Sequence, residues 1–238
     1  MTQSGLHPRT RRLRWTLFLI AIAIVLLGTG GDAVDAVMGW LRDEYERLPW
    51  YVVRVSAFLA YLALTGSVVY GLLLSTGILD RIAQRTVSFT LHQDLSGIAL
   101  ALALVHAAVL MIDRSVPYTP LEVAVPFSGP YRPIWVGIGQ LSLALGLVVF
   151  LSFYARKRIG QKRWRSLHYL SFAAFLGATA HGLMAGTDTA SSRIVVGYAV
   201  ALAVVAFLLA YRIVLALGTR RTPRGASPTP ADRSRANA

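Results

Sequence analysis

The chain has 238 residues, of which 55% are hydrophobic and 15% charged, and its mean hydropathy is +0.55. That balance is too apolar for a soluble domain of this length. Cysteine is absent, which excludes thiolate zinc sites, cysteine-ligated iron–sulfur clusters, disulfides and covalently attached heme. The net charge of +13 lies in segments between apolar runs, so the expected partner is a lipid bilayer and not nucleic acid.

Apolar runs of about the length that crosses a bilayer, roughly 20 residues, recur along the chain. They predict an all-α, integral membrane six-helix bundle over residues 15–217, with helices at 15–30, 51–75, 89–112, 134–154, 167–186 and 194–217. The first run is short and follows several arginines, as in a signal peptide, but no cleavage motif follows and we expect an uncleaved helix. Residues 1–14 are expected to form a basic cytoplasmic N-terminus and 218–238 a disordered basic tail.

The distribution of Lys and Arg predicts the orientation of these helices. Basic residues concentrate at the N-terminus, after the second helix, after the fourth helix and in the tail, whereas the other connections carry few and include acidic residues. The densest group follows the fourth helix and consists of Arg156, Lys157, Arg158, Lys162, Arg163 and Arg165. Because cytoplasmic loops carry the basic excess, both termini are predicted to be cytoplasmic, in a multi-pass protein of the cytoplasmic membrane.

Four of the five histidines lie in or at the edge of the third and fifth predicted helices. His92 and His106 are 14 residues apart, about 21 Å along a helix, and His168 and His181 are 13 apart, about 20 Å. Both helices run outward, so His92 and His168 share a depth near the cytoplasmic face, and His106 and His181 share one near the outer face. Each pair can supply two axial ligands to one heme iron.

One spacing departs from ideal helix geometry. Fourteen residues keep His92 and His106 within about 40° of one face, but 13 residues turn His181 about 140° away from His168. We therefore expect a bend, for which Gly177 or Gly182 would be suitable.

Two other roles for these histidines stay open. They can form interhelical hydrogen bonds, or they can act as a proton or metal relay in a transporter. Matched registers on two helices favour paired ligation over these alternatives.

Two stretches that contain the histidines resemble a known family. LHQDLSGIALALALVHA and RKRIGQKRWRSLHYLSFAAFLGATAHG are similar to the ferric reductase-like transmembrane domain family, which includes ferric reductases, NADPH oxidases and the heme subunit of periplasmic methionine sulfoxide reductase. The likeness covers most of residues 51–217. It implies two b-type hemes, with His92 and His168 as axial ligands of the inner heme iron and His106 and His181 as those of the outer.

The resemblance also implies roles for several other residues. Arg54 lies one turn inside the second predicted helix, where the family has an arginine near the outer heme, so it is expected to pair with a propionate; snorkelling to the interface is the alternative. Arg163, Trp164 and Arg165 are expected near inner-heme propionates, although most of that loop can serve only to orient the helices.

The chain departs from the longer relatives because no Gly-rich dinucleotide fingerprint and no flavin module follow the sixth helix. The expected function is therefore a diheme b-type transmembrane electron-transfer subunit of an oxidoreductase, which takes electrons from a separate cytoplasmic flavoprotein, ferredoxin or quinol. The acceptor at the outer face, a partner protein or a small molecule, and any flavin or quinone cofactor stay open. A quinone-linked cytochrome b is the alternative within the same class, and a proton or metal transporter the alternative from another.

Overall fold

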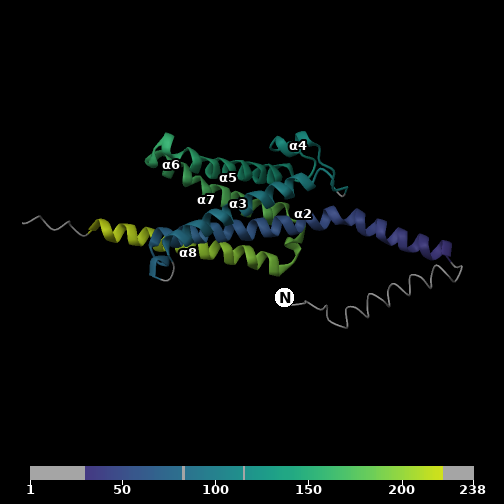
Figure 1. Ribbon diagram of the computed structural model, residues 1–238, viewed down its shortest axis with the longest axis horizontal. Helices are drawn as coiled ribbons and strands as arrows, with labels where there is room; N and C mark the ends of the chain where they lie inside the picture. Colours follow the sequence, from purple (N-terminus) through teal and green to yellow (C-terminus); the bar gives the residue numbers. More distant parts are fainter. Residues whose placement is uncertain (1–29, 82–83, 115, 222–238) are drawn as a thin grey trace, which may run out of the picture. The chain divides into compact units, whose positions relative to one another are not determined.

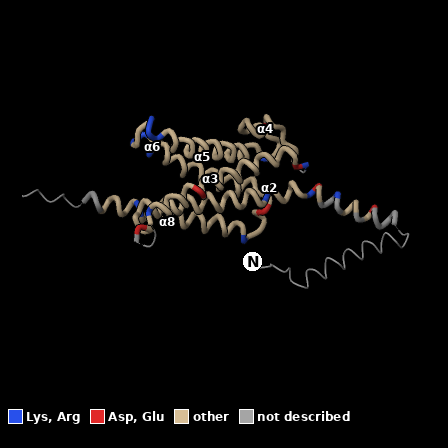
Figure 2. Tube along the Cα trace, in the orientation of Figure 1, with Lys and Arg blue, Asp and Glu red and all other residues tan. Residues whose placement is uncertain are grey.

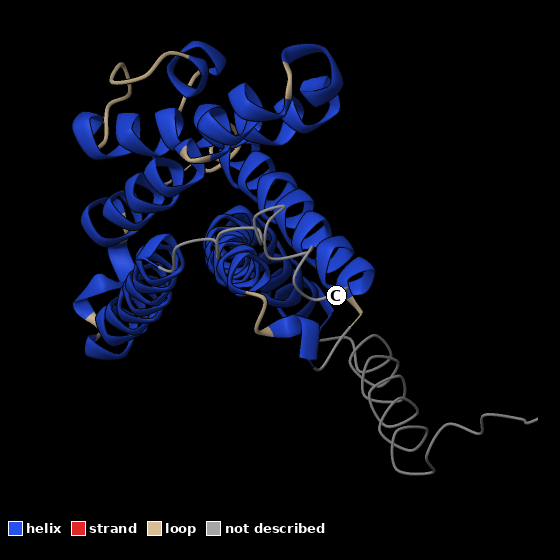
Figure 3. Cartoon of the chain, turned by 90° about the vertical axis from the view of Figure 1, so that its left-hand side faces the viewer, coloured by secondary structure: helices blue, strands red, loops and turns tan. Residues whose placement is uncertain are grey.

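The computed structural model describes residues 30–81, 84–114 and 116–221, and in these ranges the chain forms helices and loops without a β-strand (Figure 3). The predicted first helix, apart from Gly30, lies outside the described residues, as do the N-terminus and the tail beyond Arg221. The chain is therefore all-helical wherever the structure describes it, as the apolar runs predict.

The chain divides into two compact units, one up to Tyr51 and one from Val52 onward. Helix α2, Gly30–Thr76, belongs to both and begins 21 residues before the second predicted helix. In the first unit an i,i+4 ion pair joins Arg42 to Glu46 at 3.6 Å, and the ring of Trp50 meets that of Tyr51 edge-on. All functional candidates belong to the second unit.

The second unit consists of helices that follow one another with short connections (Figure 1). After α2 come η1 Leu79–Arg81, α3 Arg85–Val109, α4 Pro120–Ala124, α5 Pro133–Ile159, α6 Gln161–His168, α7 Leu170–Ala185, η2 Thr187–Ala190 and α8 Ser192–Arg221. Gly77 and Gly160 end α2 and α5 with φ of 72° and 85°, a backbone region in which other residues are strained.

Four helices of the described chain are long and apolar enough to cross a membrane: Met38–Thr76, Arg85–Val109, Pro133–Ile159 and Ser192–Gly218. The fifth predicted span corresponds to α7, whose 16 residues are fewer than the roughly 20 that a bilayer requires. Figure 2 shows Lys and Arg gathered around α6, while the long middle stretches of α5 and α7 carry none. Length, composition and charge distribution together indicate a multi-helix membrane protein.

The tightest packing in the second unit joins α5 to α7, and a buried core joins α2, α7 and α8. Phe175 on α7 is completely buried at the centre of that core, against Val68 and Leu72 of α2 and Val205 and Leu208 of α8. By contrast, α3 and α7 have almost no close backbone contact. The two helices that carry three of the four histidines are thus held apart by their neighbours.

Candidate functional site

The histidines form two facing pairs. The ring centroids of His92 on α3 and His168 at the end of α6 are 6.1 Å apart, with 72° between the ring planes. Those of His106 on α3 and His181 on α7 are 6.3 Å apart, with 71° between the planes. We call them the first pair and the second pair; they lie about 21 Å apart along α3.

These separations are those of two imidazoles that bind one metal ion from opposite sides. An imidazole nitrogen lies about 2.0–2.1 Å from a metal ion it binds and about 1.1 Å from the centroid of its own ring, so opposed ligands have centroids roughly 6.3 Å apart. Edge-to-face ring contacts have centroids about 4.5–7 Å apart, so this spacing also fits direct contact between the rings. Both pairs have the centroid separation expected of two opposed ligands of one ion.

Three of the four rings are oriented by backbone carbonyls. Nδ1 of His92 lies 2.9 Å from the carbonyl oxygen of Ser67, Nδ1 of His106 lies 2.9 Å from that of Val53, and Nδ1 of His181 lies 3.0 Å from that of Trp135. A carbonyl oxygen only accepts, so each Nδ1 carries the proton and donates. The lone pair is then on Nε2, where a metal-binding histidine needs it.

Regular helix hydrogen bonding is interrupted at Tyr169, between His168 and His181, where Phe172 donates to the carbonyl of Tyr169 three residues back. Tyr169 separates α6 from α7, so the two histidines belong to different helices and need not share one helical register. Gly177 and Gly182, where a bend was expected, lie inside the continuous helix α7. Gly177 and Gly182 are close-approach positions, where a Cβ would collide with Ser142 Oγ and with the Tyr198 hydroxyl.

Two other glycines lie directly against the histidine rings. A Cβ at Gly139 on α5 would lie 2.6 Å from Cγ and Nδ1 of His181, and a Cβ at Gly71 on α2 would lie 3.2 Å from Cε1 of His92. The first distance is far inside van der Waals contact and the second is slightly inside it. In each pair, therefore, one histidine ring occupies space that the side chain of any residue other than glycine would fill: His181 at Gly139 and His92 at Gly71.

Of the three residues expected near an inner heme, Trp164 is the one the structure brings to the first pair. Its ring lies 5.3 Å from that of His168 and 6.2 Å from that of Phe153, centroid to centroid. The indole Nε1 is buried and has no hydrogen-bond partner in the described residues, so a donor is available beside His168. Arg163 and Arg165 are exposed on α6.

Arg54 has protein partners in this structure. One guanidinium nitrogen forms a 2.8 Å ion pair with the carboxylate of Asp188, and the other donates to the hydroxyl of Thr187, both in η2. The side chains of Arg54 and Asp188 are 30% and 52% exposed, so the pair is open to its surroundings. The predicted partner, a heme propionate, would have to share Arg54 with Asp188.

Two features of the site were not identified from the sequence. Arg212 lies inside the last predicted span, and its guanidinium is 5.8 Å from the centroid of the Tyr169 ring, the residue after His168. Its charge within an apolar run could have identified Arg212 as a candidate site residue from the sequence, as it identified Arg54.

The second feature is the short helix α4 in the connection between α3 and α5. Thr119 and Glu122 form a capping box at α4, with Pro120 at its first position, and the buried Tyr118 donates to the carbonyl of Tyr131. The side-chain amide of Gln140, next to Gly139, donates to the carbonyls of Glu122 and Val123 at 2.7 and 2.8 Å. This segment therefore packs against the first turns of α5.

The two pairs fit a heme better than a bare metal ion. The described residues contain no group of three or more His, Cys, Asp or Glu that could hold an ion, and two histidines alone leave most coordination positions to other donors. A heme supplies four nitrogens in a plane and needs only the two opposed imidazoles. The unpaired Trp164 donor beside His168 suits a ligand with polar edges.

The fold and this geometry define the class: a multi-helix membrane protein with two separated pairs of facing histidines. More specifically, the chain belongs to the family described as a domain of unknown function, DUF8596, whose model matches residues 48–188. The match covers more than half of the chain and includes all four histidines, Arg54 and Asp188. No curated protein and no solved structure gives a significant match.

Proposed function

We propose that this protein is a diheme b-type electron-transfer subunit of a membrane oxidoreductase, similar to the ferric reductase-like transmembrane domains. His92 and His168 would hold one heme, and His106 and His181 the other. Electrons would enter from a donor at the cytoplasmic side and leave to an acceptor at the outer side. A heme with two histidine ligands exchanges single electrons and has no free coordination position for a substrate.

One observation carries this proposal: both pairs have nearly the same ring separation, 6.1 and 6.3 Å, at two levels of the same bundle. A hydrogen-bonded pair or a relay histidine would have no reason to repeat the spacing of opposed metal ligands. The proton on each carbonyl-bound Nδ1 supports the same assignment, because it leaves Nε2 of His92, His106 and His181 free to bind.

The residues around each pair would orient the cofactors and keep water away. Ser67, Val53 and Trp135 fix ring orientation through their carbonyls, while Phe175 packs α7 against α2 and α8. The exposed basic residues of α6 and the indole N–H of Trp164 would neutralise and bind propionates of the first heme. Arg54, which the propionate would share with Asp188, would do so for the second.

We also propose six spans with both termini in the cytoplasm, which the basic residues around α6 support. Because the chain has no cysteine, single-cysteine variants can be labelled without background. Lys162→Cys should react with an impermeant maleimide only after the membrane is opened, and Arg193→Cys should react in intact spheroplasts. The reverse pattern would overturn the orientation and leave the histidine assignment untouched.

Cofactor content tests the function directly. Purified protein should contain two b-type hemes per chain by pyridine hemochrome, and a reduced-minus-oxidised spectrum should show two components, as expected for two bis-histidine sites. A preparation expressed with sufficient heme precursor that holds one heme would remove the diheme proposal. One that holds none would favour the relay alternative.

A further inference from the structure

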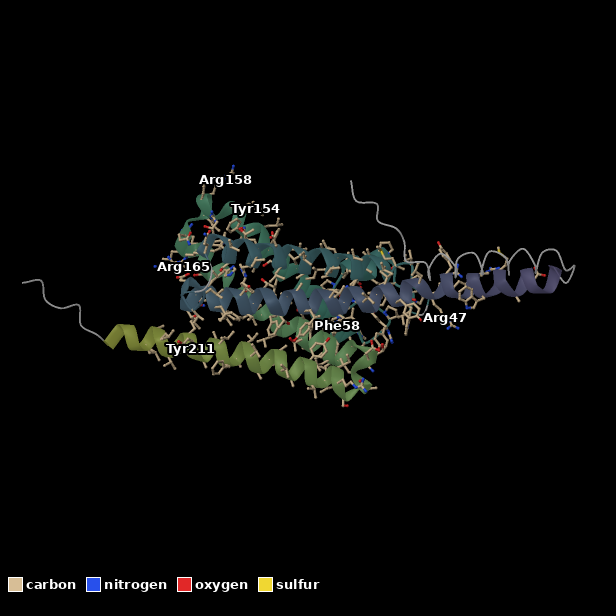
Figure 4. The ribbon with its side chains drawn as sticks, turned by 60° about the horizontal axis from the view of Figure 1, so that its bottom comes forward. Arg47, Phe58, Tyr154, Arg158, Arg165 and Tyr211 are labelled. Atoms are coloured by element: carbon tan, nitrogen blue, oxygen red, sulfur yellow. The ribbon has the colours of Figure 1, made fainter. Side chains whose placement is uncertain are left out.

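We propose that an open groove between α3 and α5 binds the headgroup of a membrane quinol, which is the electron donor of the proposed function and rests on it. The groove has a volume of about 580 Å³ and is lined by Gln93, Asp94, Gly97 and Ile98 of α3 and by Phe150 and Tyr154 of α5. That volume lies within the usual range of small-ligand sites. Figure 4 shows Tyr154 near the end of the bundle that carries Arg158 and Arg165.

Asp94 is the residue that most needs a ligand. It is an exposed carboxylate inside a helix apolar enough to cross a membrane, nine residues after the start of α3 at Arg85. In the described chain it forms no hydrogen bond or ion pair. An ionisable group at such a depth is costly and usually has a functional role.

The other lining residues match a hydroxylated aromatic ring. Gln93, which is half-buried and likewise unpartnered among the described residues, offers an amide donor and an acceptor, and Tyr154 offers a phenol hydroxyl. Phe150 provides a flat apolar face, and Gly97 lies opposite it with no side chain to fill the space. A quinol headgroup has hydroxyls for Asp94 and Gln93, a ring for Phe150 and an isoprenoid tail that stays in lipid.

The charge of the groove distinguishes a quinol from a phospholipid. No Lys or Arg lines it, so the phosphate of a lipid headgroup would meet the carboxylate of Asp94 without a compensating cation. A neutral quinol has no such repulsion, and its hydroxyl protons are what a carboxylate accepts.

A series of aromatic rings connects the groove with the first histidine pair. Tyr154 meets Phe153 at 5.6 Å, Phe153 meets Trp164 at 6.2 Å, and Trp164 meets His168 at 5.3 Å, all centroid to centroid. Electrons leaving the groove therefore have close-packed atoms along the whole way to His168. The groove is placed for a donor to the first pair and not to the second.

The reaction balances with the cofactors of the proposed function as acceptors. Each quinol breaks two O–H bonds and becomes a quinone, giving up two electrons in succession to the b-type hemes and two protons to the carboxylate of Asp94, which releases the first to cytoplasmic water before it takes the second. A proton acceptor at the reacting hydroxyl typically accelerates such a step by about 10²–10⁴-fold.

The test uses full-length protein in phosphatidylcholine nanodiscs, with decylubiquinol as donor and decylubiquinone as binding probe. Asp94→Asn should slow heme reduction by decylubiquinol by about 10²-fold or more while reduction by dithionite stays unchanged. Gly97→Leu should fill the groove and weaken decylubiquinone binding by at least about tenfold. Two controls outside the groove should behave as the unmodified protein: Gly197→Ala, whose Cβ would have nothing within 4 Å, and Asp80→Asn.

The outcomes separate the two proposals. Unchanged quinol kinetics in Asp94→Asn, unchanged quinone binding in Gly97→Leu, or displacement of the probe by phosphatidylglycerol would overturn the quinol site. Heme-loaded protein that is reduced by a flavodoxin or ferredoxin but not by decylubiquinol would overturn it and leave the diheme function standing. Heme-free protein that binds decylubiquinone, and loses it in Gly97→Leu, would support the site and overturn the function.

Discussion

The two histidine pairs have the same separation but are held in different ways. In the second pair both rings are oriented by carbonyls from neighbouring helices, Val53 on α2 and Trp135 on α5. In the first pair His92 has the carbonyl and the hydroxyl of Ser67 as partners, at 2.9 and 3.2 Å. His168 has no hydrogen bond among the described residues and rests against Trp164.

Backbone carbonyls therefore orient both rings of the second pair, whereas side chains help to hold the rings of the first pair. Backbone carbonyls cannot be removed by substitution, so the second pair should respond mainly to changes of the histidines and of Gly139. The first pair ends at a helix break beside an exposed basic helix, so it should tolerate more displacement. Substitutions that affect only one level of the bundle test this comparison.

The largest effect should come from the histidines themselves. His181→Ala or His106→Ala should remove one heme and one spectral component, and His168→Ala or His92→Ala the other, so that about one heme remains per chain in each variant. The loss follows because a missing axial ligand leaves one face of the iron unbound. Quantitation by pyridine hemochrome, with His7→Ala as the control, measures it. The same spectral loss from all four variants would contradict two separable sites.

A smaller and unequal effect is expected at the glycines that face the rings. Gly139→Ala places a methyl 2.6 Å from His181, which the anchored ring cannot avoid, so the second heme should be lost or bound at least about tenfold more weakly. Gly71→Ala places its methyl 3.2 Å from His92, where a shift of a few tenths of an ångström suffices. Heme titration of the apoprotein compares them.

Gly197→Ala is the matched control for both, because nothing lies within 4 Å of its Cβ. Equal effects at Gly139 and Gly71 would show that the two pairs are equally rigid.

The position of the paired histidines could be predicted because it depends on local periodicity and on length. Apolar runs of bilayer length fix α3, α5 and α8 within a few residues, and the 14-residue spacing fixes His92 and His106 on one face of α3. The turn between His168 and His181 could not be located, because Tyr169 is neither Gly nor Pro and keeps right-handed helical angles. The break depends on packing of α6, which no local pattern specifies.

Contacts between segments that are distant in the chain could not be predicted either, because they too depend on how the helices pack. The pairing of Arg54 with Asp188 joins residues 134 positions apart, and only the fold brings them together. The order in the connection before α5 was locally readable, since Thr119, Pro120 and Glu122 have the spacing of a capping box with proline at the first helical position.

A moderate effect, confined to the first pair, is expected at Trp164. Trp164→Phe keeps an aromatic ring against His168 but removes the buried indole donor, so heme should remain while its affinity falls by up to about tenfold. Trp164→Leu should weaken binding further because it also removes the ring contact. The first spectral component should change alone. Trp135→Phe, whose backbone carbonyl still serves His181, is the control, and an equal shift of both components would contradict the assignment.

The smallest effect is expected at α4 and depends on pH. The carboxylate of Glu122 accepts from the backbone N–H and the hydroxyl of Thr119, both at 2.8 Å, and these hydrogen bonds hold the pKa of Glu122 below its ordinary value. A carboxyl whose pKa is lower in the folded state stabilises the fold above the unfolded pKa and loses that contribution as pH falls through the folded one. The capping box should therefore loosen only below about pH 4. Hydrogen exchange of residues 119–125 should therefore accelerate below about pH 4. The variant Glu122→Gln should show this faster exchange already at neutral pH, with little further dependence on pH. If the pH transition is unchanged in Glu122→Gln, a group other than Glu122 causes it.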